Sequence, residues 1–205
     1  GTSLMFMVSE DLKVGLLTDH VPLKDVSSLI TESLIMEKAR LMNESLIKDF
    51  RLQRPKIAVL GINPHCGDKG VIGNEDDEVL RPALKKLYFD ENILVFGPFA
   101  ADSFFGSQTY RNYDAVLAPY HDQGLIAFKT IAFGSGVNYT AGLSKVRTSP
   151  DHGTAYEIAG KGIAEPESFR HAIYTALDVF RNREEYAELT KNPLKVRTLE
   201  ADKDK

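Results

Sequence analysis

Short apolar runs separated by polar turns predict several β-strands along the chain. Residues 4–8 and 12–17 are apolar and flank the polar turn Ser9-Glu10-Asp11, a pattern that indicates a β-hairpin. A polar stretch with three glycines, residues 66–74, predicts a loop. Further strand-like runs begin at Lys56 and lie at 93–96, 114–118, 137–140 and 145–148.

Apolar residues spaced three and four apart predict helices between these strands. The longest such pattern covers about residues 25–50. The acidic run 75–78 suits the start of another helix, although Pro82 favours a start near Arg81. Other helices are expected from Asp102, over 122–133 and over 168–180. Alternation of strands and helices over the first 120 residues predicts an α/β fold with a mostly parallel sheet.

The composition of the chain argues against several classes of function. The chain has 205 residues and a net charge of −4, which argues against a nucleic-acid surface. No apolar stretch approaches the ~20 residues of a membrane span, and the N-terminus lacks a signal-peptide pattern. The single cysteine, Cys66, excludes an internal disulfide and fits a cytoplasmic protein. Because the chain begins with Gly1 inside the expected hairpin, we expect it to be a piece of a longer protein.

Three histidines carry the clearest chemical signal. His20, His65 and His121 each follow an apolar run that reads as a strand. Carboxyl ends of parallel strands share one edge of a sheet, where ligands bind. A three-histidine set with an open coordination position is typical of catalytic metal sites. From position alone, a single histidine after a strand is more often an ordinary loop residue than a ligand, and Cys66 is expected to be a small packed residue rather than a ligand.

Five longer strings are more specific. They are LLTDHVPLKDV (16–26), GINPHCGDKG (61–70), GPFAADSFF (97–105), YDAVLAPYHDQGL (113–125) and VNYTAGLSKVRTSPDHGTAYEIAGKG (137–162). Together they closely resemble the 4-hydroxythreonine-4-phosphate dehydrogenase family of pyridoxal phosphate biosynthesis. The resemblance covers about residues 4–182, and it matches only the second part of the longer family chain.

The resemblance implies an isocitrate/isopropylmalate dehydrogenase-like fold of two α/β lobes and a homodimer with a shared active site. The first lobe would be incomplete here. Residues 1–125 would form the metal-site and dimerisation lobe, and 126–205 the C-terminal part of the NAD-binding lobe, with a charged tail from about 193. The metal would be a divalent cation on His20, His65 and His121, zinc first, with magnesium, cobalt or manganese as alternatives.

The family's substrate and cofactor residues also have counterparts. Its substrate contacts fall on Lys129, Asn138 and Arg147, with Lys129 also catalytic. Charge alone would class the lysine and arginine as solvated surface residues. The segment that holds the adenosine of NAD falls on His152, Gly153, Thr154 and Ala155, although NAD and NADP are not distinguished. Asp122 follows a ligand histidine and could orient its imidazole in catalysis, or could cap a helix.

These assignments imply NAD-dependent, metal-assisted oxidation of 4-phosphooxy-threonine, followed by loss of carbon dioxide to give 3-amino-2-oxopropyl phosphate. A related dehydrogenase of a phosphorylated sugar acid or a dihydrodiol is the nearest alternative. A metal-dependent hydrolase and a non-catalytic metal-binding dimerisation module are alternatives of other classes. The family's histidine–threonine pair from its N-terminal half has no match, so we expect little activity from this chain alone. We also expect self-association through the first 120 residues.

Overall fold

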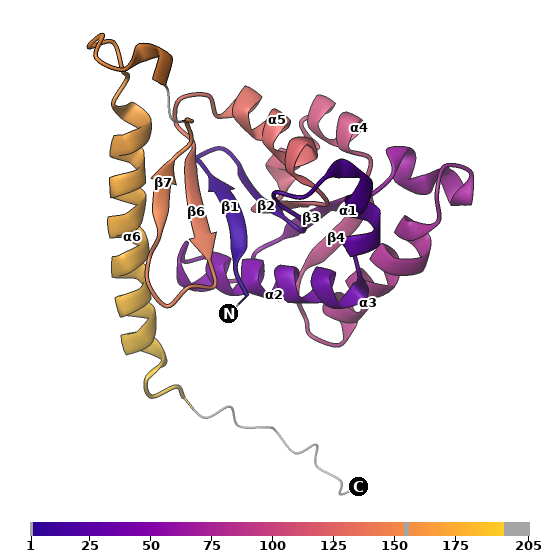
Figure 1. The fold of residues 1–205 in the computed structure, drawn as a ribbon. Helices are drawn as coiled ribbons and strands as arrows, with labels where there is room; N and C mark the ends of the chain where they lie inside the picture. Colours follow the sequence, from indigo (N-terminus) through magenta and orange to yellow (C-terminus); the bar gives the residue numbers. More distant parts are fainter. Residues whose placement is uncertain (1, 154–155, 195–205) are drawn as a thin grey trace, which may run out of the picture.

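The computed structural model describes residues 2–153 and 156–194, which contain one seven-stranded sheet with helices on both faces (Figure 1). The strand order is β4-β3-β5-β2-β1-β6-β7. The strands are β1 Leu4–Val8, β2 Lys13–Leu16, β3 Ile57–Leu60, β4 Val95–Phe99, β5 Ala115–Ala118, β6 Val137–Ala141 and β7 Thr148–Pro150. The predicted α/β class is confirmed.

Four adjacent strands of the sheet, β4, β3, β5 and β2, are parallel. The expected hairpin of β1 and β2 is confirmed, with Phe6 opposite Gly15. Antiparallel β6 and β7 extend the sheet beyond β1. The strand expected at 145–148 instead covers 148–150, and residues 142–147, which begin with Gly142 at φ 85°, form the loop that precedes it. Strands before and after residue 125 therefore belong to the same sheet. The expected division into one lobe of residues 1–125 and another of residues 126–205 stays a prediction.

The helices follow the predicted pattern with two changes. They are α1 Leu23–Leu29, α2 Glu32–Lys48, α3 Arg81–Phe89, α4 Ala101–Gly106, α5 His121–Ile131 and α6 Glu167–Thr190, with short helical turns at Pro64–Gly70, Asp76–Leu80, Thr109–Asn112 and Tyr156–Ile158. The single helix expected over 25–50 is two helices, because Thr31 caps α2 by accepting a hydrogen bond from the Leu34 N–H at 3.2 Å. The C-terminal helix extends ten residues beyond the expected end.

Strands β1, β3 and β5 divide their side chains between two apolar cores. In β3, Ile57 and Val59 face the core formed with α1, α2, α3 and α6, whereas Ala58 and Leu60 face the core formed with α4 and α5. Burial on both faces explains the continuous apolar runs of the parallel strands. Across the described ranges, no helix combines the length and the apolar character needed to cross a bilayer.

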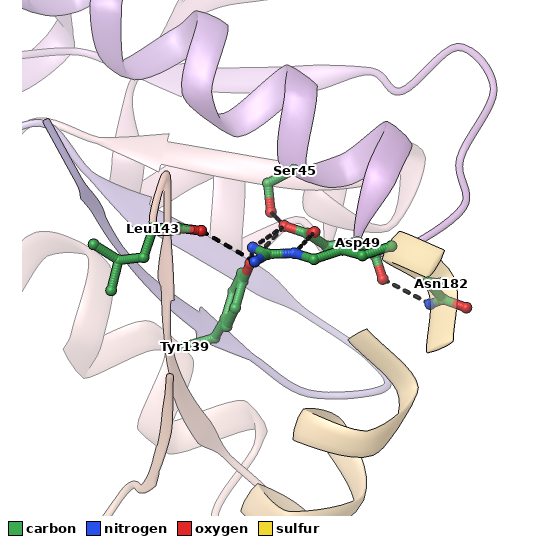
Figure 2. Close-up of polar contacts among 6 residues, drawn as sticks. Ser45, Asp49, Tyr139, Leu143 and Asn182 are labelled. Carbon is green, nitrogen blue, oxygen red and sulfur yellow. Dashed lines mark hydrogen bonds and ion pairs between the residues drawn. The ribbon is translucent and has the colours of Figure 1, made fainter. Parts of the chain in front are cut away.

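A buried polar cluster ties α6 to the rest of the fold (Figure 2). The Asp49 carboxylate is 2% exposed and accepts hydrogen bonds from Ser45, Tyr139 and Arg183. Asn182 donates to the Asp49 carbonyl at 2.7 Å. Burial, together with the hydrogen bond to Asp49, raises the pKa of the Tyr139 hydroxyl, which therefore stays a donor. The cluster joins the end of α2 to β6 and α6.

Candidate functional site

The three predicted histidines follow three neighbouring strands. His20 comes after β2, His65 after β3, and His121 after β5 as the first residue of α5, and these strands are adjacent and parallel. Their carboxyl ends therefore meet at one edge, as the sequence predicts. The rings of His20 and His121 lie side by side, with centroids 5.3 Å apart. A cavity of about 280 Å³ opens beside this pair.

A carboxylate orients one of these imidazoles. The Oδ1 atom of Asp122 lies 2.8 Å from Nδ1 of His121, which leaves Nε2 of that ring for another partner. Metal-binding histidines commonly use their second nitrogen in this way. The helix-cap alternative for Asp122 is wrong, because Tyr120 occupies the N-cap position of α5 and Asp122 lies in the first turn. Asp19 accepts a hydrogen bond from the His20 N–H at 2.9 Å.

The loop that carries His65 has an unusual backbone. Residues 65–69 all have left-handed φ angles, between 44° and 82°, although only Gly67 is free of the usual steric cost. The buried carboxylate of Asp76 holds the start of this loop. Its oxygens accept hydrogen bonds from the N–H groups of Ile62 and Asn63 at 2.8 and 2.9 Å.

Sequence reasoning missed the role of Asp76. In the sequence, Asp76 lies in the acidic run 75–78, which indicates negative charge at the start of a helix. Nothing in the sequence distinguishes it from the other acidic residues of that run. Full burial distinguishes Asp76 from its exposed neighbour Asp77. A buried carboxylate needs hydrogen-bond donors, and the backbone before His65 supplies them.

Within one protomer, the histidines do not complete a metal site. Among residues 2–153 and 156–194, no three His, Cys, Asp or Glu side chains form a group that could hold a metal ion. His20 and His121 are together, whereas the exposed His65 is not part of a three-residue group. Burial raises the pKa of the Cys66 thiol, and the charge of Asp76 adds to this effect.

A second group of predicted residues lies at the other end of α5. Lys129 and His152 line a cavity of about 580 Å³. The Lys129 ammonium lies 3.1 Å from both the carbonyl and the carboxylate of Asp151. Ser168, in the first turn of α6, accepts a hydrogen bond from the Asp151 N–H at 2.9 Å. The start of α6 thus fixes the residue that holds Lys129.

The remaining predicted residues are spread along β6 and β7. Among the described residues, nothing hydrogen-bonds the buried Oδ1 atom of Asn138. Arg147 donates to Thr140 Oγ1 at 2.8 Å. It is not among the residues that line the Lys129 cavity. Gly153 is exposed, and Thr154 and Ala155 lie outside the described residues.

The two groups are separated along one helix. His121 and Lys129 are eight residues apart on α5, which corresponds to about 12 Å of helix rise. One protomer therefore presents a histidine pair at one end of α5 and a lysine-lined cavity near the other. Both groups contain exposed or half-buried polar side chains available to a ligand.

Comparison with known proteins identifies the family. The family model described as pyridoxal phosphate biosynthetic protein PdxA matches residues 1–176. The chain belongs to the PdxA family. Its 4-hydroxythreonine-4-phosphate dehydrogenase relative from Bacteroides thetaiotaomicron is 50% identical over 193 residues, which are 94% of this chain and 53% of the relative. The chain thus spans about half the length of the curated relatives it matches.

Solved structures agree with this membership and with the isocitrate/isopropylmalate dehydrogenase-like fold. The crystal structure of a 4-hydroxythreonine-4-phosphate dehydrogenase from Klebsiella pneumoniae has a TM-score of 0.76 and 35% identity, covering 87% of this chain and 54% of that one. A terephthalate 1,2-cis-dihydrodiol dehydrogenase from Burkholderia xenovorans has a TM-score of 0.68 and 27% identity, covering 85% and 55%. The PdxA fold is therefore similar to that of enzymes named for different substrates.

Proposed function

We propose that this chain forms part of an NAD-dependent, divalent-metal-assisted dehydrogenase that oxidises 4-phosphooxy-threonine, with decarboxylation to 3-amino-2-oxopropyl phosphate. The observation that carries the proposal is the His20–His121 pair at adjacent strand ends, in a chain that belongs to the PdxA family. The family match supports a place in pyridoxal phosphate biosynthesis. The metal, the cofactor and the decarboxylation rest on the sequence resemblance and on the residues below.

The side chains at the strand ends fit a metal ion. Neutral imidazoles are preferred zinc ligands, and Asp122 holds Nδ1 of His121 so that Nε2 can face a ligand. His20, His121 and His65 would hold the ion, zinc first, with magnesium, cobalt or manganese as alternatives. A divalent cation held there would supply the positive charge that favours ionisation of a substrate hydroxyl.

Lys129 would contact the substrate. Its ammonium is held by Asp151 at the edge of a cavity and suits an anionic amino-acid phosphate. Asn138 offers a buried amide oxygen that has no hydrogen-bond partner among the described residues, so it could accept a bond from a ligand. Arg147 would contribute a forked cationic contact if substrate extends along β6.

His152 and Gly153 would contact the adenosine of NAD, together with Thr154 and Ala155 by resemblance. The cavity beside His152, at about 580 Å³, has a size typical of ligand pockets and fits part of a dinucleotide. NAD, when bound, would accept hydride from the carbon that bears the substrate hydroxyl. The exposed ring of Phe133 lines the same cavity and would exclude water from one side.

A homodimer with a shared active site would explain why the site residues form two groups. The histidine pair and Lys129 lie about 12 Å apart along α5 in one protomer. A two-fold axis could bring the histidines of one protomer to the lysine of its partner. This arrangement also accounts for the missing third ligand within a single protomer.

One alternative substrate has specific support. The similarity to the Burkholderia dihydrodiol dehydrogenase favours a dihydrodiol as the second candidate. The metal-dependent hydrolase and the non-catalytic module need no nicotinamide cofactor, and NAD titration followed by calorimetry separates both from a dehydrogenase.

Metal analysis tests the site that carries the proposal. Protein purified without chelator should contain near one divalent ion per chain by mass spectrometry. His20→Ala, His65→Ala and His121→Ala should each lower that content. His171→Ala is the matched control, because His171 lies on α6 beside the other cavity. Unchanged metal in His121→Ala would show that the assignment is mistaken.

A further inference from the structure

Two long-range hydrogen bonds tie the histidine-bearing segments to one another, and both come from side chains that have no role in the proposed function. Thr18 lies two residues before His20, and Gln123 lies two residues after His121. Their side-chain bonds span 101 and 62 residues of sequence. Each therefore connects segments that are remote along the chain.

Thr18 joins the segment before His20 to the segment before His121. The Pro119 carbonyl accepts two hydrogen bonds from Thr18, at 3.1 Å from its N–H and at 2.8 Å from its hydroxyl. Proline has no N–H, so this carbonyl is the only backbone hydrogen-bonding group that Pro119 offers. Thr18 is 5% exposed, and its buried hydroxyl needs such a partner.

This contact sets the register of the histidine pair. Thr18 and Pro119 each lie two residues before a histidine, and the centroids of the two rings are 5.3 Å apart. A slip of one residue between the segments would displace one ring by about 3.5 Å relative to the other. Metal–ligand distances are fixed to within about 0.2 Å, so an ion shared by both rings would not tolerate that slip.

Gln123 joins the first turn of α5 to the loop that carries His65. Its Nε2 atom donates to the carbonyl of the buried Gly61 at 2.8 Å. Gly61 directly follows β3 and lies four residues before His65. Since a carbonyl accepts only from the nitrogen of the amide, this contact fixes which way the amide is turned. Among the described residues, nothing hydrogen-bonds the buried Oε1 atom, so the Gly61 contact alone orients the side chain.

The surroundings of Gly61 pass this constraint on to the His65 loop. A Cβ at Gly61 would lie 2.9 Å from Cys66 Sγ and 3.2 Å from Asp76 Oδ1, so both side chains pack directly against its backbone. Cys66 follows His65, and Asp76 holds the backbone before it. A displacement of Gly61 would therefore disturb the loop on both sides of the imidazole.

We propose that Thr18 and Gln123 are positioning residues of the histidine site. Thr18 sets the register of His20 against His121, and Gln123 sets the place of the His65 loop against α5. Both act through the backbone of the segments that carry the imidazoles. The proposal rests on the proposed function only for the ligand that the histidines hold, and the two contacts can be tested with and without a metal.

Zinc affinity tests the proposal, measured on this chain by competition with a chromophoric chelator. Thr18→Val and Gln123→Met nearly keep the size of each side chain and remove its hydrogen bond. Each should weaken Zn²⁺ binding by about tenfold or more, as is usual when a group that orients metal ligands is lost. Thr18→Ser retains the hydroxyl and should restore most of the affinity.

Two matched controls remove the same kinds of hydrogen bond on β7 and α6. Thr148→Val removes a hydroxyl bond to the Ala172 carbonyl, also 2.8 Å long, and Asn182→Leu removes an amide bond to the Asp49 carbonyl at 2.7 Å. Urea unfolding measures the loss of stability in all four variants. The controls should lose stability but keep the Zn²⁺ affinity of the parent. Equal losses of affinity in controls and site variants would overturn the proposal, because general destabilisation would then explain them.

Hydrogen exchange of the metal-free chain separates this proposal from the proposed function. Thr18→Val should speed exchange of the N–H groups of residues 17 and 18, which donate across to the segment before His121. Gln123→Met should speed exchange at residues 61–63, and neither variant should affect the other group. If the parent binds no Zn²⁺, the proposed function fails and the exchange result alone decides the positioning. Unchanged exchange at both groups, or unchanged affinity of both site variants when the parent binds Zn²⁺, would overturn the proposal.

Discussion

Arg183 donates a hydrogen bond from Nε to the Asp49 carboxylate at 2.6 Å, across 134 residues of sequence. Asp49 follows α2, and Arg183 lies in α6. The guanidinium also donates to the Leu143 carbonyl at 3.0 Å and to the Tyr139 hydroxyl at 2.8 Å. The pair therefore joins α6 to the loop after β6 as well as to α2. Ser168, also on α6, accepts a hydrogen bond from the N–H of Asp151, and Asp151 contacts Lys129. By fixing α6 on the fold, the Asp49–Arg183 pair therefore also helps to position the predicted Lys129 site.

Asp49→Asn should destabilise the fold by about 2–3 kcal/mol, because it leaves the Arg183 charge without its partner. The value lies below that for a fully buried pair, since 15% of the Arg183 side chain is exposed. Urea unfolding measures the change. The control is Arg51→Ala, which removes an exposed ion pair to Glu185 on the same helix and should cost less than about 1 kcal/mol. Equal losses would contradict the role of the buried cluster.

Gly67→Ala should destabilise the His65 loop by about 2 kcal/mol or more, through left-handed strain and a steric clash. Gly67 has φ 82°, and a Cβ there would lie 2.2 Å from the Gly73 carbonyl oxygen. Gly106→Ala is the control: apart from its chain neighbours and the backbone of its own helix, no described atom lies within 4 Å of its Cβ position, and the change should be nearly neutral. Thermal melting compares the two. A neutral Gly67→Ala would show that the loop rearranges easily.

Asp76→Asn should cost about 1–3 kcal/mol, because one of its backbone donors loses a charged acceptor in a buried position. If His65 binds metal, metal affinity should also fall, since the loop that presents it is loosened. Asp77→Asn removes an exposed ion pair to Arg81 and should leave both properties nearly unchanged. Denaturation and metal titration measure the two effects. Identical behaviour of the two variants would refute a specific role for Asp76.

The parallel part of the fold was predictable where a strand is buried on both faces, because such a strand is an uninterrupted apolar run in the sequence. Ile57–Leu60 and Ala115–Ala118 are examples, and their parallel pairing places the segments that lead to His65 and His121 at the same edge of the sheet. The break between α1 and α2 was harder to predict. In the sequence, Thr31 fits the helical pattern around it. Only the structure shows that its side chain caps the second helix.

Of the candidate site residues, only those that follow strands could be predicted from the sequence to lie close together. His20 and His121 meet because strand order fixes their positions. The Lys129–Asp151 contact depends on where β7 and α6 pack, which local periodicity does not specify. Self-association is expected through the first 120 residues, yet Ile35, Ala39, Met42 and Leu46 of α2 are all buried within the protomer and are not available for a dimer contact. The dimer thus stays a prediction that needs a different surface.

That surface should adjoin the histidine pair. Leu23 is 71% exposed and lines the cavity beside His20 and His121. We expect a dimer at micromolar concentration in sedimentation, weakened by a chelator and by Leu23→Asp. Leu29→Asp is the control, because Leu29 is exposed on the same helix but points in another direction. A monomer at all concentrations, with metal present, would contradict a shared site.

The chain alone should turn over little or no 4-phosphooxy-threonine, even with NAD and metal. Its candidate groups are present, but Lys129 and the histidine pair lie about 12 Å apart in one protomer, and the cavity wall beside α6 is exposed. Hydride transfer requires near-attack positioning, and its loss can slow a reaction by a factor of thousands or more. A chimera in which this chain replaces its aligned counterpart in the Bacteroides relative should restore NADH production, measured by absorbance. Lys129→Ala in that chimera should abolish most of the gain, whereas Lys85→Ala, on the exposed side of α3, should not. Comparable rates from the chain and the chimera would show that the residues described here suffice for catalysis.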